Sequence, residues 1–321
     1  MSIEQYDLIV VTPVYEDVEA SGRLFEELAK QYPKGLFVVA IDDGSVKQPL
    51  DISGLQRAGL NGVVLKLRRN VGHQKAIAIG LGYVSEHVRR DQLTVVMDSD
   101  GEDVPSTIPN LLKRLRSADT DVVVGKRKSR VETLKFKLFY SLYKRFFRII
   151  TGRKINFGNF MALTATSVKR LAAMPESSIH VASAVLASKL RVGTCSLDRG
   201  PRYAGQSKMN FVGLVLHGFK GLMVFAEDVL VRVGIASALI AGFCLFGGGA
   251  AVVLKALGYA TPGWFSVAFG ILLLMFLQTG ALALMTLMLT GVMRSGSVTT
   301  PLVYHDFVEE VIESRSSEAS S

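Results

Sequence analysis

The chain has 321 residues, a formal net charge of +9 and a hydrophobic content of 49%. This length suits one large domain or two small ones, and the hydrophobic content is high for a soluble protein. The charge suits a protein held against anionic lipid or nucleic acid, and because no aromatic and basic RNA-binding motif is present, we expect a membrane and no nucleic acid. The two cysteines, Cys195 and Cys244, fall in segments that we assign to different compartments, so we expect no disulfide.

Short apolar strands alternate with helices over the first two thirds of the chain. Such alternation predicts an α/β fold with a mostly parallel sheet, in which ligands bind beyond the carboxyl ends of the strands. We expect strands at 7–11, 36–41, 63–67, 93–97, 121–124, 156–163 and 191–197, and helices at 16–32, 74–90, 167–174 and 179–190.

The fourth of these strands runs into VVMDSDGEDVP at 95–105, where three carboxylates, Asp98, Asp100 and Glu102, are spaced two residues apart. Carboxylates with no nearby His or Cys favour Mg²⁺ or Mn²⁺, which proteins usually hold with one or two carboxylates plus substrate phosphates. The alternative is that the acids cap the helix that Pro105 and Ser106 would begin. A second acidic pair, 42–43, also follows a strand, and the repetition favours a nucleotide and metal site.

Basic residues gather in later segments. The segment 133–150 interleaves lysines and arginines with phenylalanines, which predicts either an amphipathic helix in the membrane interface or a surface helix with its aromatic stripe in the core. A basic, glycine-containing loop at 199–208 follows, and then a second amphipathic stretch at 211–228.

Between Arg232 and Arg294 the only charged residue is Lys255. A membrane-spanning helix needs about 20 apolar residues, so we expect two, at about 231–254 and 264–290. The hairpin returns the chain to the side it left, and the flanking basic residues predict that this side is cytoplasmic. The polar, acidic start predicts no cleavable signal peptide. The expected divisions are a cytoplasmic domain at 1–208, juxtamembrane helices at 209–228, the hairpin at 229–293 and a cytoplasmic tail at 294–321, ordered over 302–312.

Five motifs in order resemble family 2 glycosyltransferases, and with two following helices they are most similar to the polyisoprenyl-phosphate glycosyltransferases of the dolichol-phosphate mannose synthase and GtrB type. They are TPVYED at 12–17, IDDGS at 41–45, RRNVGHQKAIAIGL at 68–81, VMDSDGED at 96–103 and RYAGQSK at 202–208. The resemblance implies a GT-A fold, a UDP- or GDP-hexose donor, Mg²⁺ or Mn²⁺, a polyprenyl (undecaprenyl) phosphate acceptor and a homotetramer in the inner membrane.

The resemblance also implies roles for individual residues. The nucleotide-sugar positions are Pro13, Tyr15, Asp17, Ile41, Asp43, Asp98, Ser99 and Asp100. The metal positions are Asp98 and Asp100, with Glu102 as a possible third ligand. The residues expected in catalysis are Asp98, Asp100, Arg127, Arg202 and Lys208, and the lipid phosphate would meet Arg127, Arg130, Arg202 and Lys208, although each basic residue could instead be a solvated surface charge.

The chain departs from this family at two positions. Asp17 replaces the more usual glutamate, and Asn159, in the sequence GNF, stands where relatives often have an aspartate proposed as a base. A lipid phosphate with a second pKa near 6 is largely dianionic at neutral pH and needs no strong base; otherwise Asp17 or Asp103 would take that role. His73 either contacts the nucleotide or is structural.

The expected activity is an inverting transfer of one hexose to polyprenyl phosphate for cell-envelope glycan modification. Two alternatives remain. One is a glycosyltransferase that extends a lipid-linked or surface saccharide at a sugar hydroxyl, which would need a base. The other is a non-catalytic membrane scaffold or transport subunit, although helices with no internal charge offer a solute no polar path.

Overall fold

The computed structural model describes residues 3–117, 119–127, 144–154, 157–203, 211–259, 263–296 and 303–314. The chain divides into two compact units, which we describe separately. The sheet domain comprises Met1–Ser141, Lys154–Val224 and Thr300–Ser321, and the hairpin unit comprises Leu142–Arg153 and Phe225–Thr299. Arg130, Lys208 and most of the basic helix expected at 133–150 lie outside the described residues.

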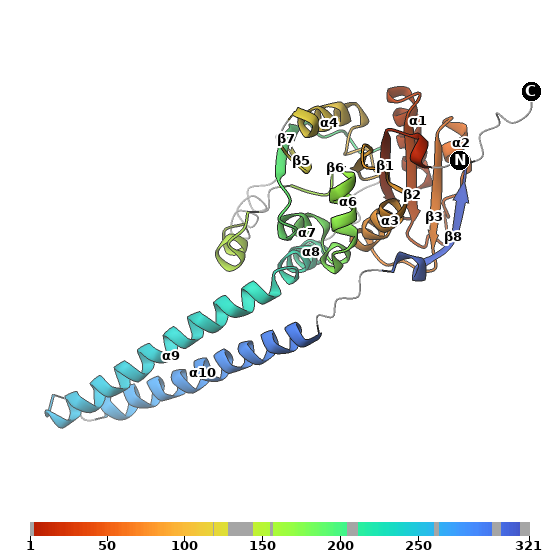
Figure 1. Ribbon diagram of the computed structural model, residues 1–321. Helices are drawn as coiled ribbons and strands as arrows, with labels where there is room; N and C mark the ends of the chain where they lie inside the picture. The colour runs from red at the N-terminus through yellow and green to blue at the C-terminus, as the bar shows by residue number, and fades with distance from the viewer. Residues whose placement is uncertain are drawn as a thin grey trace, which may run out of the picture. The chain divides into compact units, whose positions relative to one another are not determined.

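The sheet domain is built on an eight-stranded sheet, with strand order β7-β5-β6-β4-β1-β2-β3-β8 among the described residues (Figure 1). β1 pairs in parallel with both β2 and β4, whereas β6 and β8 run antiparallel to their neighbours. The prediction of an α/β fold with a mostly parallel sheet is therefore confirmed. The strands are β1 Leu8–Val14, β2 Leu36–Asp42, β3 Asn61–Leu67, β4 Leu93–Val96, β5 Val122–Arg127, β6 Met161–Thr164, β7 Val192–Leu197 and β8 Val308–Glu313.

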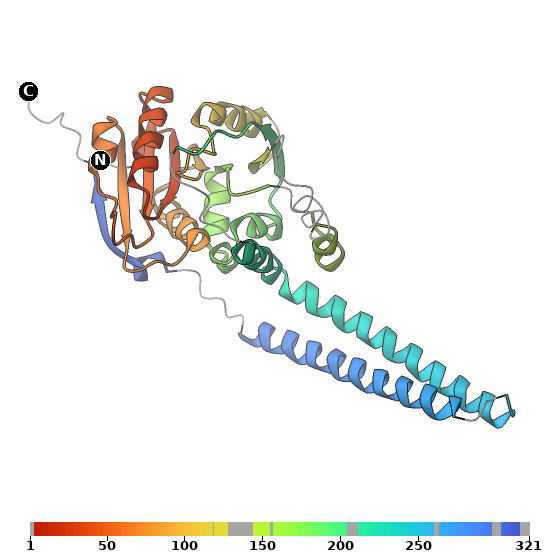
Figure 2. The same cartoon turned by 180° about the vertical axis from the view of Figure 1, so that it is seen from behind.

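Helices cover both faces of this sheet (Figures 1 and 2). Because successive side chains on a strand point to opposite faces, Ile9 and Val11 of β1 belong to one apolar core, whereas Leu8 and Val10 belong to the other. The first core includes α3 His73–His87, α6 Ala165–Ala172 and α7 Val181–Ala187, and the second includes α1 Val18–Gln31, α2 Ser53–Arg57 and α4 Ile108–Ser117. The last helix in the second segment of the sheet domain, Lys154–Val224, is α8 Phe211–Met223.

The segment after the hairpin returns to the sheet domain. β8 pairs antiparallel with β3 and covers that edge of the sheet, an edge that would otherwise present unpaired backbone groups. Just before it, the Tyr304 hydroxyl donates to Glu86 at 2.8 Å. A Cβ at Gly82 would lie 3.1 Å from the Tyr304 ring, so the glycine permits this close packing. The tail predicted to be ordered over 302–312 thus contains a strand of the sheet.

The hairpin unit contains α9 Ala226–Ala256 and α10 Trp264–Gly296. In the part of the chain that the structure describes, these two helices are long and apolar enough to cross a membrane, each with a mean hydropathy of 2.2 over its most apolar window. Large apolar side chains on α9 are exposed, with Phe246 at 79%. Exposing so much apolar surface to water would cost free energy, which favours a membrane environment for these helices. They form a candidate transmembrane hairpin, as predicted at about 231–254 and 264–290.

Candidate active site

The predicted acidic stretch lies where the strand order of the sheet reverses. The chain runs from β1 to β2 and β3 on one side, whereas β4 pairs with β1 on its other side. In open α/β sheets such a reversal leaves a crevice beyond the carboxyl ends of the strands, and ligands bind there. The loop that carries Asp98, Ser99, Asp100 and Glu102 leaves β4 at this crevice, and we call residues 98–103 the acidic loop.

Hydrogen bonds within the acidic loop fix its shape. The Asp98 N–H donates to Asp103 Oδ2 at 3.0 Å, and the Glu102 N–H donates to Asp100 Oδ1 at 3.0 Å. Asp98 Oδ1 lies 3.1 Å from His73 Nε2, at the start of α3. The 3-10 turn Pro105–Thr107 begins after Val104 without a side-chain cap. The alternative prediction, that these carboxylates cap the helical turn beginning at Pro105, is therefore wrong.

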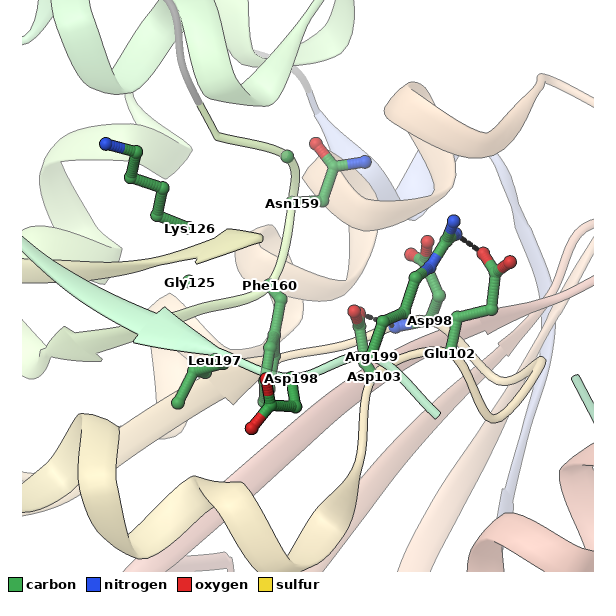
Figure 3. Close-up of a pocket in the computed structure, with 11 residues that line it drawn as sticks. Asp98, Glu102, Asp103, Gly125, Lys126, Asn159, Phe160, Leu197, Asp198 and Arg199 are labelled. Atoms are coloured by element: carbon green, nitrogen blue, oxygen red, sulfur yellow. Dashed lines mark hydrogen bonds and ion pairs between the residues drawn. The ribbon is translucent and has the colours of Figure 1, made fainter. Parts of the chain in front are cut away.

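Two arginines meet the acidic loop from the segment after β7. Arg202 Nη2 lies 2.9 Å from Asp100 Oδ2, and Arg202 Nε lies 3.2 Å from Glu102 Oε1. Arg199 pairs with Glu102, and Figure 3 shows its guanidinium directed at that carboxylate. Arg202 was predicted, whereas Arg199 was noted only as the first residue of the basic loop. Guanidinium groups placed this way can exchange a carboxylate for the phosphate oxygens of a ligand.

Backbone contacts hold the arginine segment in place. The Tyr203 N–H donates to the Asp100 carbonyl at 2.9 Å, and the Gly200 N–H donates to the Glu102 carbonyl at 3.1 Å. Gly101 has φ of 87°, and a Cβ there would come within 2.7 Å of the Tyr203 ring. Only glycine satisfies both conditions without a shift of the loop. The acidic loop and the two arginines are thus positioned together.

The charges at this site perturb one another. Burial raises the pKa of Asp100, and the neighbouring charge of Asp98 raises it further, against the opposing effect of Arg202. Partial desolvation by the surrounding protein lowers the pKa of His73, but the charges of Asp98, Asp100 and Asp103 outweigh it and raise the pKa overall. Asp98 and Asp100 therefore repel each other in their charged forms, a cost that a bound cation would relieve.

The donor groups fit a divalent ion held by two protein carboxylates. Among the described residues no three His, Cys, Asp or Glu side chains are grouped as ligands of one ion, and Glu102, the predicted third ligand, is paired with Arg199 and Arg202. Mg²⁺ and Mn²⁺ prefer oxygen donors, and Mg²⁺ sites often use one or two carboxylates with substrate phosphates and water. Asp98 and Asp100 provide that set.

The second acidic pair joins two loops. Asp43 accepts from the backbone N–H of Val71 at 2.7 Å and of Gly72 at 3.0 Å, one on each carboxylate oxygen. At Gly44, where φ is 68°, a Cβ would lie 2.4 Å from the Asn70 nitrogen. Asp43 therefore fixes the loop after β2 against the loop that begins α3. The predicted nucleoside position Ile41 is fully buried in the core, directly opposite Pro13 on β1.

The loop after β1 is also fixed by carboxylates. Glu16 has φ of 49°, and its carboxylate accepts from the backbone N–H groups of residues 46–48 at 2.7–3.2 Å. These bonds lower the pKa of Glu16. The predicted site residue Asp17 caps α1 by accepting from the Ala20 N–H at 3.4 Å, and Tyr15 is exposed. The sequence had not singled out Glu16.

A pocket opens beside the acidic loop (Figure 3). Asn159 lines it, and its Nδ2 lies 3.1 Å from His73 Nε2. Arg127 ends β5, but the structure does not describe its side chain. The contact between His73 and Asn159 joins residues 86 positions apart, so no local pattern in the sequence could reveal it. The pocket is lined by Asp98, Glu102, Asp103, Gly125, Lys126, Gly158, Asn159, Phe160, Leu197, Asp198 and Arg199.

Several known proteins with similar sequences are named as glycosyltransferases. An uncharacterized glycosyltransferase of Bacillus subtilis, YkoT, is 28% identical over 79% of this chain and 74% of its own length. Dodecaprenyl-phosphate galacturonate synthase of Rhizobium johnstonii is 26% identical over 64% of this chain and 62% of its own. An undecaprenyl-phosphate 4-deoxy-4-formamido-L-arabinose transferase of Shewanella sediminis is 29% identical over 74% of this chain and 72% of its own.

The fold is also that of a solved glycosyltransferase. Glucosyl-3-phosphoglycerate synthase of Mycobacterium tuberculosis, solved with Mn²⁺, UDP-glucose and phosphoglyceric acid, matches 70% of this chain and 80% of its own, with a TM-score of 0.50 and 12% identity. At that identity the likeness concerns the GT-A-like fold alone. The family model for glycosyl transferase family 2 matches residues 9–172. The chain is therefore a glycosyltransferase and belongs to glycosyltransferase family 2.

Proposed function

We propose that this glycosyltransferase moves a single hexose from a UDP- or GDP-sugar to polyprenyl phosphate of the undecaprenyl type. The observation behind the proposal is that the acidic loop, with Asp98 and Asp100, is paired with two arginines at the sheet crevice: Arg202 contacts Asp100, and Arg199 contacts Glu102. Such a site suits a diphosphate and a divalent ion, Mg²⁺ or Mn²⁺. The names of relatives that act with dodecaprenyl and undecaprenyl phosphate support the lipid acceptor.

In the proposed reaction, an oxygen of the acceptor phosphate attacks the anomeric carbon from the face opposite the diphosphate. The carbon–oxygen bond to the diphosphate breaks, and the nucleoside diphosphate leaves with the electron pair, which inverts the anomeric centre. Arg199 and Arg202 would bind phosphate oxygens, with Arg127, Arg130 and Lys208 as further candidates. A divalent ion held by Asp98 and Asp100 would stabilise the charge that builds on the leaving group.

The identity of residue 159 favours a phosphate acceptor over a sugar hydroxyl. Asn159 lines the pocket and carries an amide, which takes up no proton at neutral pH. The two other candidate bases are engaged elsewhere, because Asp17 caps α1 and Asp103 accepts the Asp98 N–H. A phosphomonoester is largely dianionic at neutral pH and can attack unaided.

The nucleotide is proposed to lie against the loops that follow β1 and β2, near Pro13, Tyr15, Asp17, Ile41 and Asp43. The hairpin begins after α8 and is followed by β8, so both of its ends connect to the sheet domain. If both helices span the bilayer, that domain lies on one side, which we propose is the cytoplasmic side because basic residues flank the hairpin. A homotetramer is proposed from the family resemblance.

The direct assay uses the full-length protein in detergent with Mg²⁺ or Mn²⁺, polyprenyl phosphate and a panel of nucleotide sugars. We expect one donor to give a glycosylated lipid phosphate. Absence of that product with every donor would contradict the proposal. A saccharide acceptor added in competition separates the alternative, since transfer to its hydroxyl in preference to the lipid phosphate would establish saccharide extension.

A further inference from the structure

His73 lies between two residues of the site that come from distant parts of the chain. It is the first residue of α3, and its Nε2 lies 3.1 Å from Asp98 Oδ1 and 3.1 Å from the Asn159 amide. Asp98 follows β4, and Asn159 precedes β6. The His73 side chain is 44% exposed and that of Asp98 is 33% exposed, so both are accessible to a ligand.

The hydrogen-bonding capacity of each group determines the proton on His73. An ionised carboxylate only accepts, so the 3.1 Å approach of Asp98 Oδ1 to His73 Nε2 becomes a hydrogen bond when Nε2 carries the hydrogen. That N–H also faces the Asn159 amide. If the amide nitrogen were on that side, two N–H donors, one from His73 and one from Asn159, would face each other without an acceptor. With the amide turned so that its oxygen faces the ring, one N–H is shared between Asp98 and Asn159.

Asp98 is then held at two points. Its backbone N–H donates to Asp103, and its carboxylate oxygen Oδ1 lies within ion-pair distance of His73 Nε2. Carboxylates that bind a metal ion are usually oriented by such hydrogen bonds, and loss of the partner typically weakens metal affinity or activity by about 10- to 100-fold. The sequence left His73 open between a nucleotide contact and a structural role.

We propose that His73 is the positioning residue for Asp98, orienting its carboxylate toward the divalent ion and donor, and that the neutral Asn159 steadies the ring without competing for it. The inference rests on the proposed function. It also explains why an amide suits position 159 in this chain: an aspartate there would compete with Asp98 for the same N–H.

The test uses the full-length protein and three variants, His73→Ala, His73→Gln and Asn159→Asp, with Asp91→Asn as a control at an exposed carboxylate outside the site. Three quantities are measured: kcat and KM for the donor, Mn²⁺ affinity in the presence of the nucleoside diphosphate by calorimetry, and Tm. We expect His73→Ala to weaken Mn²⁺ affinity and kcat by about 10- to 100-fold at unchanged Tm.

The conservative variant separates positioning from mere packing. The glutamine side chain can donate an N–H to Asp98, so His73→Gln is expected to recover most of the Mn²⁺ affinity and kcat. Asn159→Asp is expected to lower both. The inference would be overturned if His73→Ala matched the wild type, if His73→Gln were as impaired as His73→Ala, or if Asn159→Asp raised turnover.

The two proposals fail in different ways. If the wild type transferred no sugar from any donor, the proposed function would fail, whereas Mn²⁺ affinity would still test whether His73 positions Asp98. Suppose instead that the wild type is active and that His73→Ala has normal Mn²⁺ affinity and normal kcat. That result would contradict the proposed role of His73 and leave the proposed function intact.

Discussion

Two acidic pairs follow strands of the same sheet, yet their carboxylates have different partners. Asp42 and Asp43 are 3% and 2% exposed, and each of their four oxygens accepts a backbone N–H, at 2.7–3.0 Å. Asp98 Oδ1 and Asp100 Oδ2 instead contact the side chains of His73 and Arg202, and Asp100 Oδ1 accepts the backbone N–H of Glu102 in the same loop. A carboxylate bound to backbone cannot change partner without moving a loop, whereas one bound to side chains can exchange them for a cation or a phosphate-bearing ligand.

The largest expected effect is on Asp100. Asp100→Asn should lower sugar transfer by about 100-fold or more, because the charge that would hold the ion is lost. The pKa of Asp100 is already raised by burial and by Asp98, so losing its charge should change Tm by no more than about 3 °C. Steady-state transfer rates and thermal melts check this. A variant that kept its rate would remove Asp100 from the site.

The opposite outcome is expected at Asp43. Asp43→Asn should lower the free energy of unfolding by about 1–3 kcal/mol, since an amide cannot accept from both the Val71 and Gly72 N–H groups and one is left unpaired. Thermal melts of the variant and of Asp91→Asn provide the comparison. An unchanged Tm would show that Asp43 does not fix the two loops.

A similar contrast holds between His73, which contacts side chains of the site, and His180, which accepts a backbone N–H. The buried His180 gives a pH dependence of stability. His180 is buried, its Nδ1 accepts from the Ser183 N–H at 3.1 Å, and its Nε2 lies 3.2 Å from His217 Nε2. Burial and the neighbouring His217 lower the pKa of His180 to about 3. The unfolded chain takes up a proton below pH about 6.5 whereas the native ring does not, so stability should fall as pH decreases, by about 2 kcal/mol from this group at pH 5.

His180→Asn keeps an acceptor for the Ser183 N–H but does not titrate. Its unfolding free energy should therefore depend less on pH than that of the wild type between pH 7 and 5. Equal pH dependence in the two proteins would assign the effect to other groups.

The smallest expected effect concerns Glu102. If Glu102 orients Arg199 and Arg202, Glu102→Gln retains an oxygen that accepts from them, and kcat/KM should fall by less than about tenfold. If Glu102 is the third metal ligand instead, the loss should approach that of Asp100→Asn. Parallel kinetics of the two variants distinguish these roles.

The sequence predicted the parts of the fold that have a clear periodicity. Apolar runs such as Leu8–Val14 and Leu36–Asp42 are buried at every position, and that pattern identifies strands between two helical layers. β8 is different, because four of its six side chains are exposed and three of those are glutamates, and its pairing with β3 is a long-range backbone contact that composition does not reveal.

The site was predictable in its acidic loop and less so in its partners. Asp98 and Asp100 stand out because two carboxylates interrupt an apolar run. The contact of Asp98 with His73 and the pairing of Arg199 with Glu102 depend on where separate loops meet, which only the folded chain determines. Glu16 was missed because a conformation with positive φ gives no sign in the sequence.

The most direct measurement is calorimetric binding of UDP and GDP to the full-length protein with and without Mn²⁺, repeated for Asp100→Asn and for Asp43→Asn below its melting temperature. We predict Mn²⁺-dependent binding that Asp100→Asn weakens by about 100-fold and Asp43→Asn by less than about tenfold. Undiminished Mn²⁺-dependent binding in Asp100→Asn, together with its loss in Asp43→Asn, would contradict the assignment of the acidic loop as the donor site.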